Sequence, residues 1–137
     1  MTRADTLNDL ITSERLVLEP LVGAHAELLF EAMLEPEIYR WISSLPPPNL
    51  EVLKQRWSAA ERRGPNASGG FDLNWAVRRT SDGRYIGKVD AYVAKDAIAT
   101  NVGYIFFPAF WNHGYATEAV RALVAWSATE WSSRGRW

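Results

Sequence analysis

The sequence predicts an α/β protein of the α+β type, built on a mostly antiparallel sheet that is flanked by helices. Two observations lead to this class. One run of alternating apolar residues lies near the start of the chain, and three more follow one another closely in its second half. Two helical stretches separate the first run from the others, and a long helical stretch follows the last.

The first strand is expected at residues 13–21, where Leu16 and Leu18 alternate with polar neighbours and Pro20 ends the run. The next segment, residues 23–34, has apolar side chains at helical spacing and is predicted to be a helix. Its inward stripe is expected to consist of Ala24, Leu28 and Ala32, with Leu29 and Met33 beside it.

A second helix is predicted at residues 49–64. The three successive prolines before it cannot form a helix or a central strand, because they lack backbone donors. Asn49 is a suitable N-terminal cap, and Gly64 is a suitable stop. The inward face is expected to consist of Leu50, Leu53, Trp57 and Ala60.

The second half of the chain opens with a predicted hairpin. Residues 71–79 and 84–94 both have the composition of strands. Between them, Asp82 and Gly83 tolerate the positive backbone angles of a tight turn. The two strands should therefore pair in an antiparallel way.

A third strand and a long helix follow the hairpin. The strand is expected at residues 99–107, and Pro108 closes it by removing a backbone donor. The helix is expected to run from Ala116 to Ser133. Its inward face should consist of Ala116, Ala119, Val120, Leu123 and Trp126.

Length and composition narrow the class of protein further. At 137 residues, 47% of them hydrophobic, the chain is expected to form one domain, residues 1–137. A net charge of −1 gives no positive field that would attract nucleic acid or an anionic membrane. With no cysteine there is no thiolate nucleophile, and no metal site is predicted. No membrane-spanning stretch or secretion signal is found, so a cytoplasmic location is expected.

The stretch FWNHGYATEAV, residues 110–120, lies between the third predicted strand and the long helix. The first amides of a helix lack partners within it and carry the positive end of its dipole. Gly114 lets a ligand approach the backbone, and with Asn112 and His113 it can form a nest of N–H groups. The turn is a candidate site for phosphate or pyrophosphate, although the same glycine would suit a tight turn that binds nothing.

Gly103 interrupts the strand that leads into this turn. A glycine there can mark a β-bulge or the close approach of a ligand, or it can be a simple packing position. A bulge would free backbone groups to pair with an extended ligand that carries amides, and these groups belong to Tyr104, Ile105, Phe106 and Phe107. Coenzyme A matches both features, because its pantetheine arm carries two amides and its other end a pyrophosphate.

Three stretches, SERLVLEPL, GRYIGKVDAYV and NVGYIFFPAFWNHGYATEAVRALVAW, resemble the GNAT superfamily of N-acetyltransferases in sequence and order. The resemblance extends from about Ser13 to Trp131 and is closest to the ribosomal-protein alanine acetyltransferase-like branch. It implies the acyl-CoA N-acyltransferase fold, acetyl-CoA as co-substrate, and an amine of a small molecule, peptide or protein as acceptor. It implies that the strand at residues 104–107 holds pantetheine. The pyrophosphate would lie on Asn112, His113, Gly114, Tyr115, Ala116 and Thr117.

Two positions depart from the family pattern. Trp111 stands where a Gln or Arg begins the phosphate-binding motif Q/R-x-x-G-x-G/A. Asn101 stands two residues before Gly103, where this branch commonly has a glutamate. An amide cannot take a proton, so Asn101 is expected at most to orient a water or the amine. A lysine acceptor, with a pKa of about 10.4, needs a base more than an N-terminal amine at about 7.7–8.0.

Other side chains are weaker candidates for the chemistry. His113 is expected to have a structural or phosphate-neighbour role, and His25 is expected at the surface. Glu118 is favoured in the first turn of its helix by the dipole, whatever the function. By resemblance, Tyr39 and Trp41 stand where the family receives its acceptor, but aromatic packing is the stronger interpretation of both.

Members of the family continue beyond the long helix, whereas this sequence stops at SSRGRW. The fold is therefore expected to be truncated, with the outer edge of residues 99–107 unpaired. Such an edge would favour self-association or a homodimer, weak coenzyme A binding and no measurable acetyl transfer. Two alternatives to an active enzyme stay open. One is a coenzyme-binding or regulatory module that has lost catalysis, and the other is an interaction domain that pairs through its exposed edge.

Overall fold

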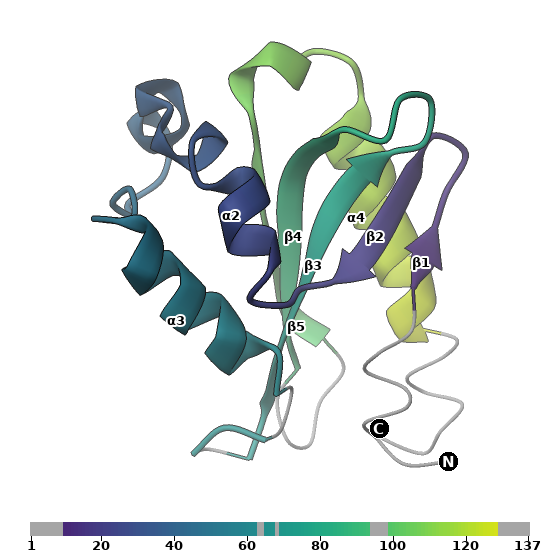
Figure 1. The fold of residues 1–137 in the computed structure, drawn as a ribbon. Coiled ribbons are helices and arrows are strands. Elements are labelled where there is room, and N and C mark those ends of the chain that lie inside the picture. Colours follow the sequence, from purple (N-terminus) through teal and green to yellow (C-terminus); the bar gives the residue numbers. More distant parts are fainter. Residues whose placement is uncertain (1–9, 63–64, 68, 94–98, 129–137) are drawn as a thin grey trace.

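The computed structural model describes residues 10–62, 65–67, 69–93 and 99–128. These residues contain one five-stranded sheet in the order β1-β2-β3-β4-β5, with antiparallel neighbours throughout. Helices α2 and α3 lie on one side of the sheet and α4 on the other (Figure 1). The strands are β1 (Ile11–Thr12), β2 (Leu16–Pro20), β3 (Phe71–Arg79), β4 (Tyr85–Val93) and β5 (Ala99–Phe106). The helices are α2 (His25–Leu29), α3 (Leu50–Ala60) and α4 (Tyr115–Trp126), with short 3-10 turns at Ala32–Leu34, Pro36–Arg40 and Pro108–Phe110.

This architecture confirms the predicted class and most of the predicted elements. The strand expected at residues 71–79 is β3 itself, and the turn after it has Gly83 at a φ of 74°. The short strand β1 was not expected, because two residues are too few to show an alternating pattern. Gly64 and Ser133, the expected stops of two helices, lie outside the described residues.

One layer of buried side chains lies between the sheet and α4. Trp75 on β3 is fully buried, and its ring meets that of Trp126 edge-on, with ring centres 5.2 Å apart. Leu16 and Leu18 of β2 are also fully buried, as their alternation predicts. Burying side chains of this size stabilises the fold by roughly 1.5–3 kcal/mol each, so this layer fixes α4 against the sheet.

The inward stripe of the first helix differs from the prediction. Leu28 is 66% exposed, whereas Ala26, Leu29 and Met33 are buried. The α-helix has only five residues and passes into a 3-10 turn, so the spacing expected for a continuous α-helix does not hold. The α3 prediction is confirmed, because the Asn49 side chain caps the helix by accepting the Val52 amide at 2.9 Å.

The prediction that His25 lies at the surface is wrong, because the residue is only 7% exposed. Its Nε2 lies 3.2 Å from Glu19, and its Nδ1 accepts the amide of Val22 at 3.0 Å. Glu19 also accepts hydrogen bonds from the Tyr85 hydroxyl at 2.6 Å and from Arg78 at 2.9 Å. Partial burial and this bond to Glu19 raise the pKa of Tyr85 to about 12. The cluster ties α2 to the sheet.

Gly103 does not form a bulge on the side of β5 that faces β4. Pairing is regular from Gly87 opposite Phe106 to Tyr92 opposite Asn101, with Gly103 directly opposite Asp90. The register shifts only after Tyr92, at the far end of the strand. Gly103 is therefore a position of close approach, and the side chain that approaches it is that of Asp90.

Neither of two other kinds of site is found in the described parts of the chain. No helix there is long and apolar enough to cross a membrane. The same residues bring no three His, Asp or Glu side chains together in a group that could hold a metal ion.

Candidate functional site

A hollow of about 400 Å³ lies beside β5, where this strand leads into α4. Its walls come from β5, from the turn before α4, and from the segment at residues 38–42. We call it the β5 hollow. It is lined by Ile38, Trp41, Ile42, Tyr104, Ile105, Phe106, Phe110, Trp111, Asn112, Gly114, Tyr115, Ala116 and Thr117.

The backbone of β5 presents alternate residues to this hollow. The amide of Phe107 donates to the carbonyl of Ile86 on the neighbouring chain segment at 3.0 Å. In an antiparallel pair, residues that bond to the partner alternate with residues whose backbone groups point away. Ile105 therefore faces β4, whereas Tyr104 and Phe106 direct their N–H and C=O groups outward. Within the described residues β5 is an edge of the sheet, so no strand covers these groups.

Trp111 closes one end of the exposed edge. Its indole Nε1 donates to the carbonyl oxygen of Phe106 at 2.6 Å. The Tyr104 N–H and C=O and the Phe106 N–H remain as the outward groups that border the hollow. Trp111 stands where the family motif has a Gln or Arg. Its indole still supplies a hydrogen-bond donor, which explains how an aromatic side chain is accommodated there.

The turn before α4 has two residues in the left-handed region. Asn112 has a φ of 65°, and Gly114, the cap residue of α4, has a φ of 78° and a ψ of 8°. No side chain among the described residues caps this helix end. The first amides of α4 are therefore free to bind an anion, and the residues that carry them line the β5 hollow.

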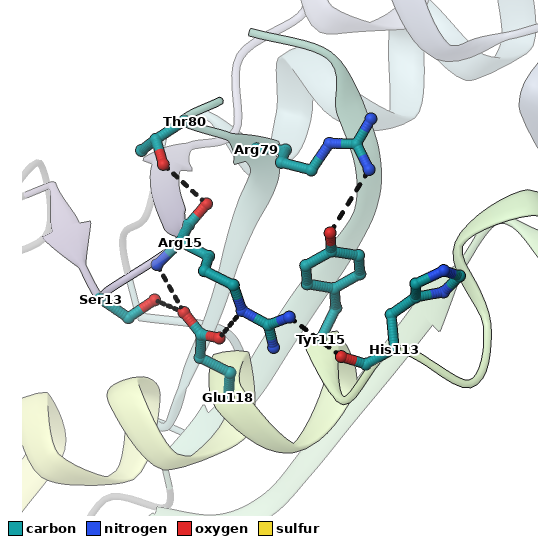
Figure 2. A network of polar contacts seen from close by, with 7 residues as sticks. All are labelled: Ser13, Arg15, Arg79, Thr80, His113, Tyr115 and Glu118. Carbon is teal, nitrogen blue, oxygen red and sulfur yellow. Dashed lines mark hydrogen bonds and ion pairs between the residues drawn. The ribbon is translucent and has the colours of Figure 1, made fainter. Parts of the chain in front are cut away.

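Arg15 holds the turn from behind (Figure 2). Its Nη1 donates to the carbonyl oxygen of His113 at 3.1 Å, and its guanidinium lies 4.4 Å from the centre of the Tyr115 ring. The C=O and N–H of one trans peptide point in opposite directions. Since Arg15 binds the carbonyl of His113, the amide of Gly114 in the same peptide is directed away from Arg15.

Glu118 anchors Arg15 to α4 (Figure 2). One carboxylate oxygen accepts the Ser13 hydroxyl at 2.6 Å and the Arg15 amide at 2.8 Å, and the other accepts Arg15 Nε at 2.6 Å. Partial burial opposes ionisation, but these hydrogen bonds outweigh it and lower the pKa of Glu118 below its ordinary value of 4.5. Glu118 therefore joins the start of the chain to the first turn of α4, a role beyond the dipole effect that the sequence suggests.

Replacing Glu118 should make the protein less stable in a pH-dependent way. We expect Glu118→Gln to lower the free energy of unfolding at neutral pH by about 1–3 kcal/mol, since an amide group cannot satisfy all three donors. A lowered folded-state pKa stabilises the fold above the ordinary value of 4.5, and this contribution is lost as the pH falls through the folded-state pKa. Urea denaturation of both proteins at neutral and at acidic pH measures the difference, which should shrink in acid.

The matched control for this prediction is Glu27→Gln. Glu27 pairs with Lys54 at 3.0 Å, but its side chain is 62% exposed, so the same change of charge should have little effect. An equal loss of stability in both variants would contradict a specific role for Glu118.

The predicted coenzyme-binding residues largely meet in one place. All of them line the β5 hollow except Phe107 and His113. The Phe107 side chain is buried and its amide donates to the Ile86 carbonyl, so this amide is not among the outward donors of β5. His113 stacks on Tyr115 with ring centres 5.6 Å apart, and its Nδ1 lies 2.7 Å from the Trp111 carbonyl oxygen, which supports the structural role.

The two aromatic residues predicted near the acceptor, Tyr39 and Trp41, differ in their surroundings. The Tyr39 hydroxyl donates to the Met33 carbonyl at 2.5 Å, and partial burial raises its pKa. Tyr39 is therefore a packing residue. Trp41 is 73% exposed and lines the β5 hollow, so packing does not account for it.

Sequence reasoning missed the contributions of Arg15, Ile38 and Ile42. Arg15 lies about a hundred residues from its partners His113 and Glu118, and no local pattern signals such a contact. Asn101, the predicted orienting residue, is exposed and lies opposite Tyr92, outside the lining of the hollow.

An antiparallel sheet whose strand β5 runs through a glycine turn into a long helix fits the fold of the acyl-CoA N-acyltransferases. Comparison with known proteins agrees with this class. The chain belongs to the acetyltransferase (GNAT) domain family, whose model matches residues 15–134.

Individual relatives are distant in sequence. The uncharacterized N-acetyltransferase YoaA of Bacillus subtilis (strain 168) is 21% identical over 118 residues, which are 85% of this chain and 65% of YoaA. RimL, a ribosomal L7/L12 α-N-protein acetyltransferase, superimposes with a TM-score of 0.66 at 19% identity, over 93% of this chain and 67% of RimL.

A third similar protein was solved with ligands. The microcin C7 self-immunity acetyltransferase MccE, in complex with acetyl-CoA and AMP, has a TM-score of 0.63 at 17% identity, over 90% of this chain and 66% of MccE. At such identities the structures show a shared fold. The chain spans about two thirds of the length of these relatives.

Proposed function

We propose that this chain is the acetyl-CoA-binding part of an N-acetyltransferase, which transfers an acetyl group to an amine of a small molecule, peptide or protein in the cytoplasm. The observation that carries the proposal is the continuity of two binding surfaces. The outward backbone groups of β5 and the uncapped amides of α4 line the same hollow. An extended ligand with amides at one end and a pyrophosphate at the other fits both.

The chain's own residues account for both halves of this ligand. Tyr104 and Phe106 offer outward backbone groups for strand-like hydrogen bonds to the pantetheine amides. The amides from Gly114 to Thr117 offer donors and a positive dipole end to the pyrophosphate. Arg15, held by Glu118, fixes the peptide that aims the Gly114 amide.

The acceptor would enter from the side of Trp41. This side chain lines the hollow, is largely exposed and lies across from β5. Acetyl transfer joins the acceptor nitrogen to the acyl carbon and releases the thiol. The reaction needs a neutral amine and donors for the developing oxyanion, and outward N–H groups of β5 are suited to the second task.

Binding measurements test the proposal. Titration calorimetry with coenzyme A should give saturable binding, and ADP should compete because it carries the pyrophosphate half alone. Absence of any coenzyme A binding up to millimolar concentration would refute the proposal. A thiol-release assay with a panel of amines then separates an enzyme from a coenzyme-binding module.

The open edge of β5 supports one second candidate, an interaction domain that pairs with another chain or with a second copy in a homodimer. Its outward backbone groups would then form hydrogen bonds to a partner strand. In this case coenzyme A would not bind, and sedimentation would show an oligomer. If coenzyme A instead dissociates an oligomer, the same edge serves both ligands.

Restoring the family's carboxylate should improve catalysis. We expect Asn101→Glu to raise turnover of amines at neutral pH about tenfold, because a carboxylate can take the proton that an amide cannot. The pH profile of turnover should gain a carboxylate-like limb. Asn101→Gln is the matched control of equal length without charge, and an equal gain in that variant would contradict the explanation.

A further inference from the structure

Asp90 places a carboxylate directly over the glycine that interrupts β5. The two residues are opposite one another in the β4–β5 pair, so their side-chain positions share one face of the sheet. A Cβ atom at Gly103 would lie 2.8 Å from Asp90 Oδ1 and 3.2 Å from Oδ2. No side chain fits at position 103 unless this carboxylate moves. Because Gly103 has no side chain, the Asp90 carboxylate can occupy the space above it.

The carboxylate is only partly engaged by its neighbours. Lys88 Nζ lies 3.4 Å from Asp90 Oδ2 and 3.2 Å from Asn74 Oδ1, so the lysine is shared between two oxygen acceptors. The Lys88 side chain is 12% exposed, whereas that of Asp90 is 44% exposed. Oδ1, on the side of Gly103, is the atom that a ligand on β5 can reach.

The face of the sheet that carries Asp90 and Gly103 continues into the β5 hollow. Ile105 pairs with Lys88, shares the face of Gly103 and Asp90, and lines the hollow. Gly103 lies two residues from Ile105, or about 7 Å along the strand. A ligand anchored by its pyrophosphate at the turn after β5 must run back along β5, so its far end reaches the position of Gly103.

The charges near this position favour a cation. In the three rows of side chains closest to the hollow, this face carries Asp72, Asp90, Glu19 and Lys88, which sum to two negative charges. Asn101, in the row farthest from the hollow, contributes no charge. An acceptor amine that approaches as an ammonium ion therefore meets a net negative surface.

We propose that Asp90 binds the acceptor ammonium and takes its proton, the task that Asn101 cannot perform; this inference rests on the proposed acetyltransferase function. The ammonium gives one proton to the Asp90 carboxylate, and the neutral nitrogen attacks the carbonyl carbon of the acyl thioester. The C–N bond forms, the C–S bond breaks, and the sulfur leaves with the electron pair. The second nitrogen proton passes to the thiolate, and Asp90 returns its proton to water.

A purely structural role for Asp90 as the counter-ion of Lys88 predicts different behaviour. Under that role, Asp90→Asn would leave the partly buried Lys88 without a carboxylate partner, with only Asn74 Oδ1 as acceptor, and the further change Lys88→Gln would relieve the defect. Under our proposal, the double variant stays as impaired as Asp90→Asn alone, because the carboxylate is still missing.

The first experiment measures the turnover of amines. Asp90→Asn should lower kcat/KM for amines about a hundredfold, and Asp90→Asn combined with Asn101→Glu should regain most of it, since the carboxylate returns to the neighbouring row. Glu27→Gln is the control, because it removes a carboxylate on α2 that is 62% exposed and lies outside this face, and it should change kcat/KM less than threefold. Two results together would overturn the proposal. In them, Asn101→Glu fails to restore the activity of Asp90→Asn, and Lys88→Gln restores it.

The second experiment does not depend on turnover. Butylammonium, titrated into the coenzyme A-bound chain, should shift the amide NMR signals of Asp90 and Gly103, and the uncharged butanol should not. Asp90→Asn should abolish the shifts and keep its coenzyme A affinity. If coenzyme A binds but butylammonium causes no shift at these amides, the Asp90 assignment is wrong. If coenzyme A itself fails to bind, the proposed function is wrong.

Discussion

Gly114→Val should weaken coenzyme A binding by well over tenfold, which is more than about 1.4 kcal/mol. Gly114 has a φ of 78°, a conformation that β-branched residues avoid, so valine would force the backbone of the turn to change. The space around the residue is not the obstacle, because the nearest atom to an added Cβ is Arg15 Nη2 at 3.5 Å. Titration calorimetry of both proteins with coenzyme A measures the loss.

The control for this variant is Gly83→Val. Gly83 has a φ of 74° in the β3–β4 turn, and an added Cβ would meet no atom within 4 Å. It therefore imposes a similar backbone strain at a residue outside the lining of the β5 hollow. Equal coenzyme A affinity in Gly114→Val and wild type, with both variants folded, would rule out the turn as the pyrophosphate site.

Tyr104→Pro should reduce coenzyme A affinity about tenfold, or about 1.4 kcal/mol, while the protein stays folded. The Tyr104 amide points outward from β5, so proline removes a donor that the sheet does not use. The pantetheine arm would lose that donor. Calorimetry gives the affinity, and circular dichroism confirms the fold.

Two further proline variants make this test specific. Val102→Pro removes another outward amide, but Val102 does not line the hollow, so both fold and affinity should be kept. Ile105→Pro removes an inward amide that bonds to β4 and should destabilise the protein by about 3 kcal/mol or more. If Ile105→Pro lowers affinity without loss of stability, the orientation of the edge is opposite to that inferred from the Phe107–Ile86 bond.

The sequence by itself determined the elements that depend on neighbours along the chain. Alternation of apolar residues located β2, β3, β4 and β5, because successive side chains in a strand point to opposite faces. The turn before α4 was recognisable because a glycine before a helix start supplies a conformation that other residues avoid. These signals are local, and they sufficed for the fold class and for the position of the turn that we propose as the phosphate site.

Only the tertiary structure decided which side chains and backbone groups meet. The bonds of Arg15 to Glu118 and His113 join segments about a hundred residues apart, and a sequence pattern carries no information on such pairs. The burial of His25 depends on Glu19 and Tyr85, which lie on different strands.

The register of β4 against β5 is likewise a property of the folded sheet. It turns Tyr104 and Phe106 outward, turns Phe107 inward, and brings Asp90 over Gly103. A shift of one residue would exchange the two faces and reverse each of these assignments. The sequence located the strands of this site, but the pairing between them decided which atoms a ligand can reach.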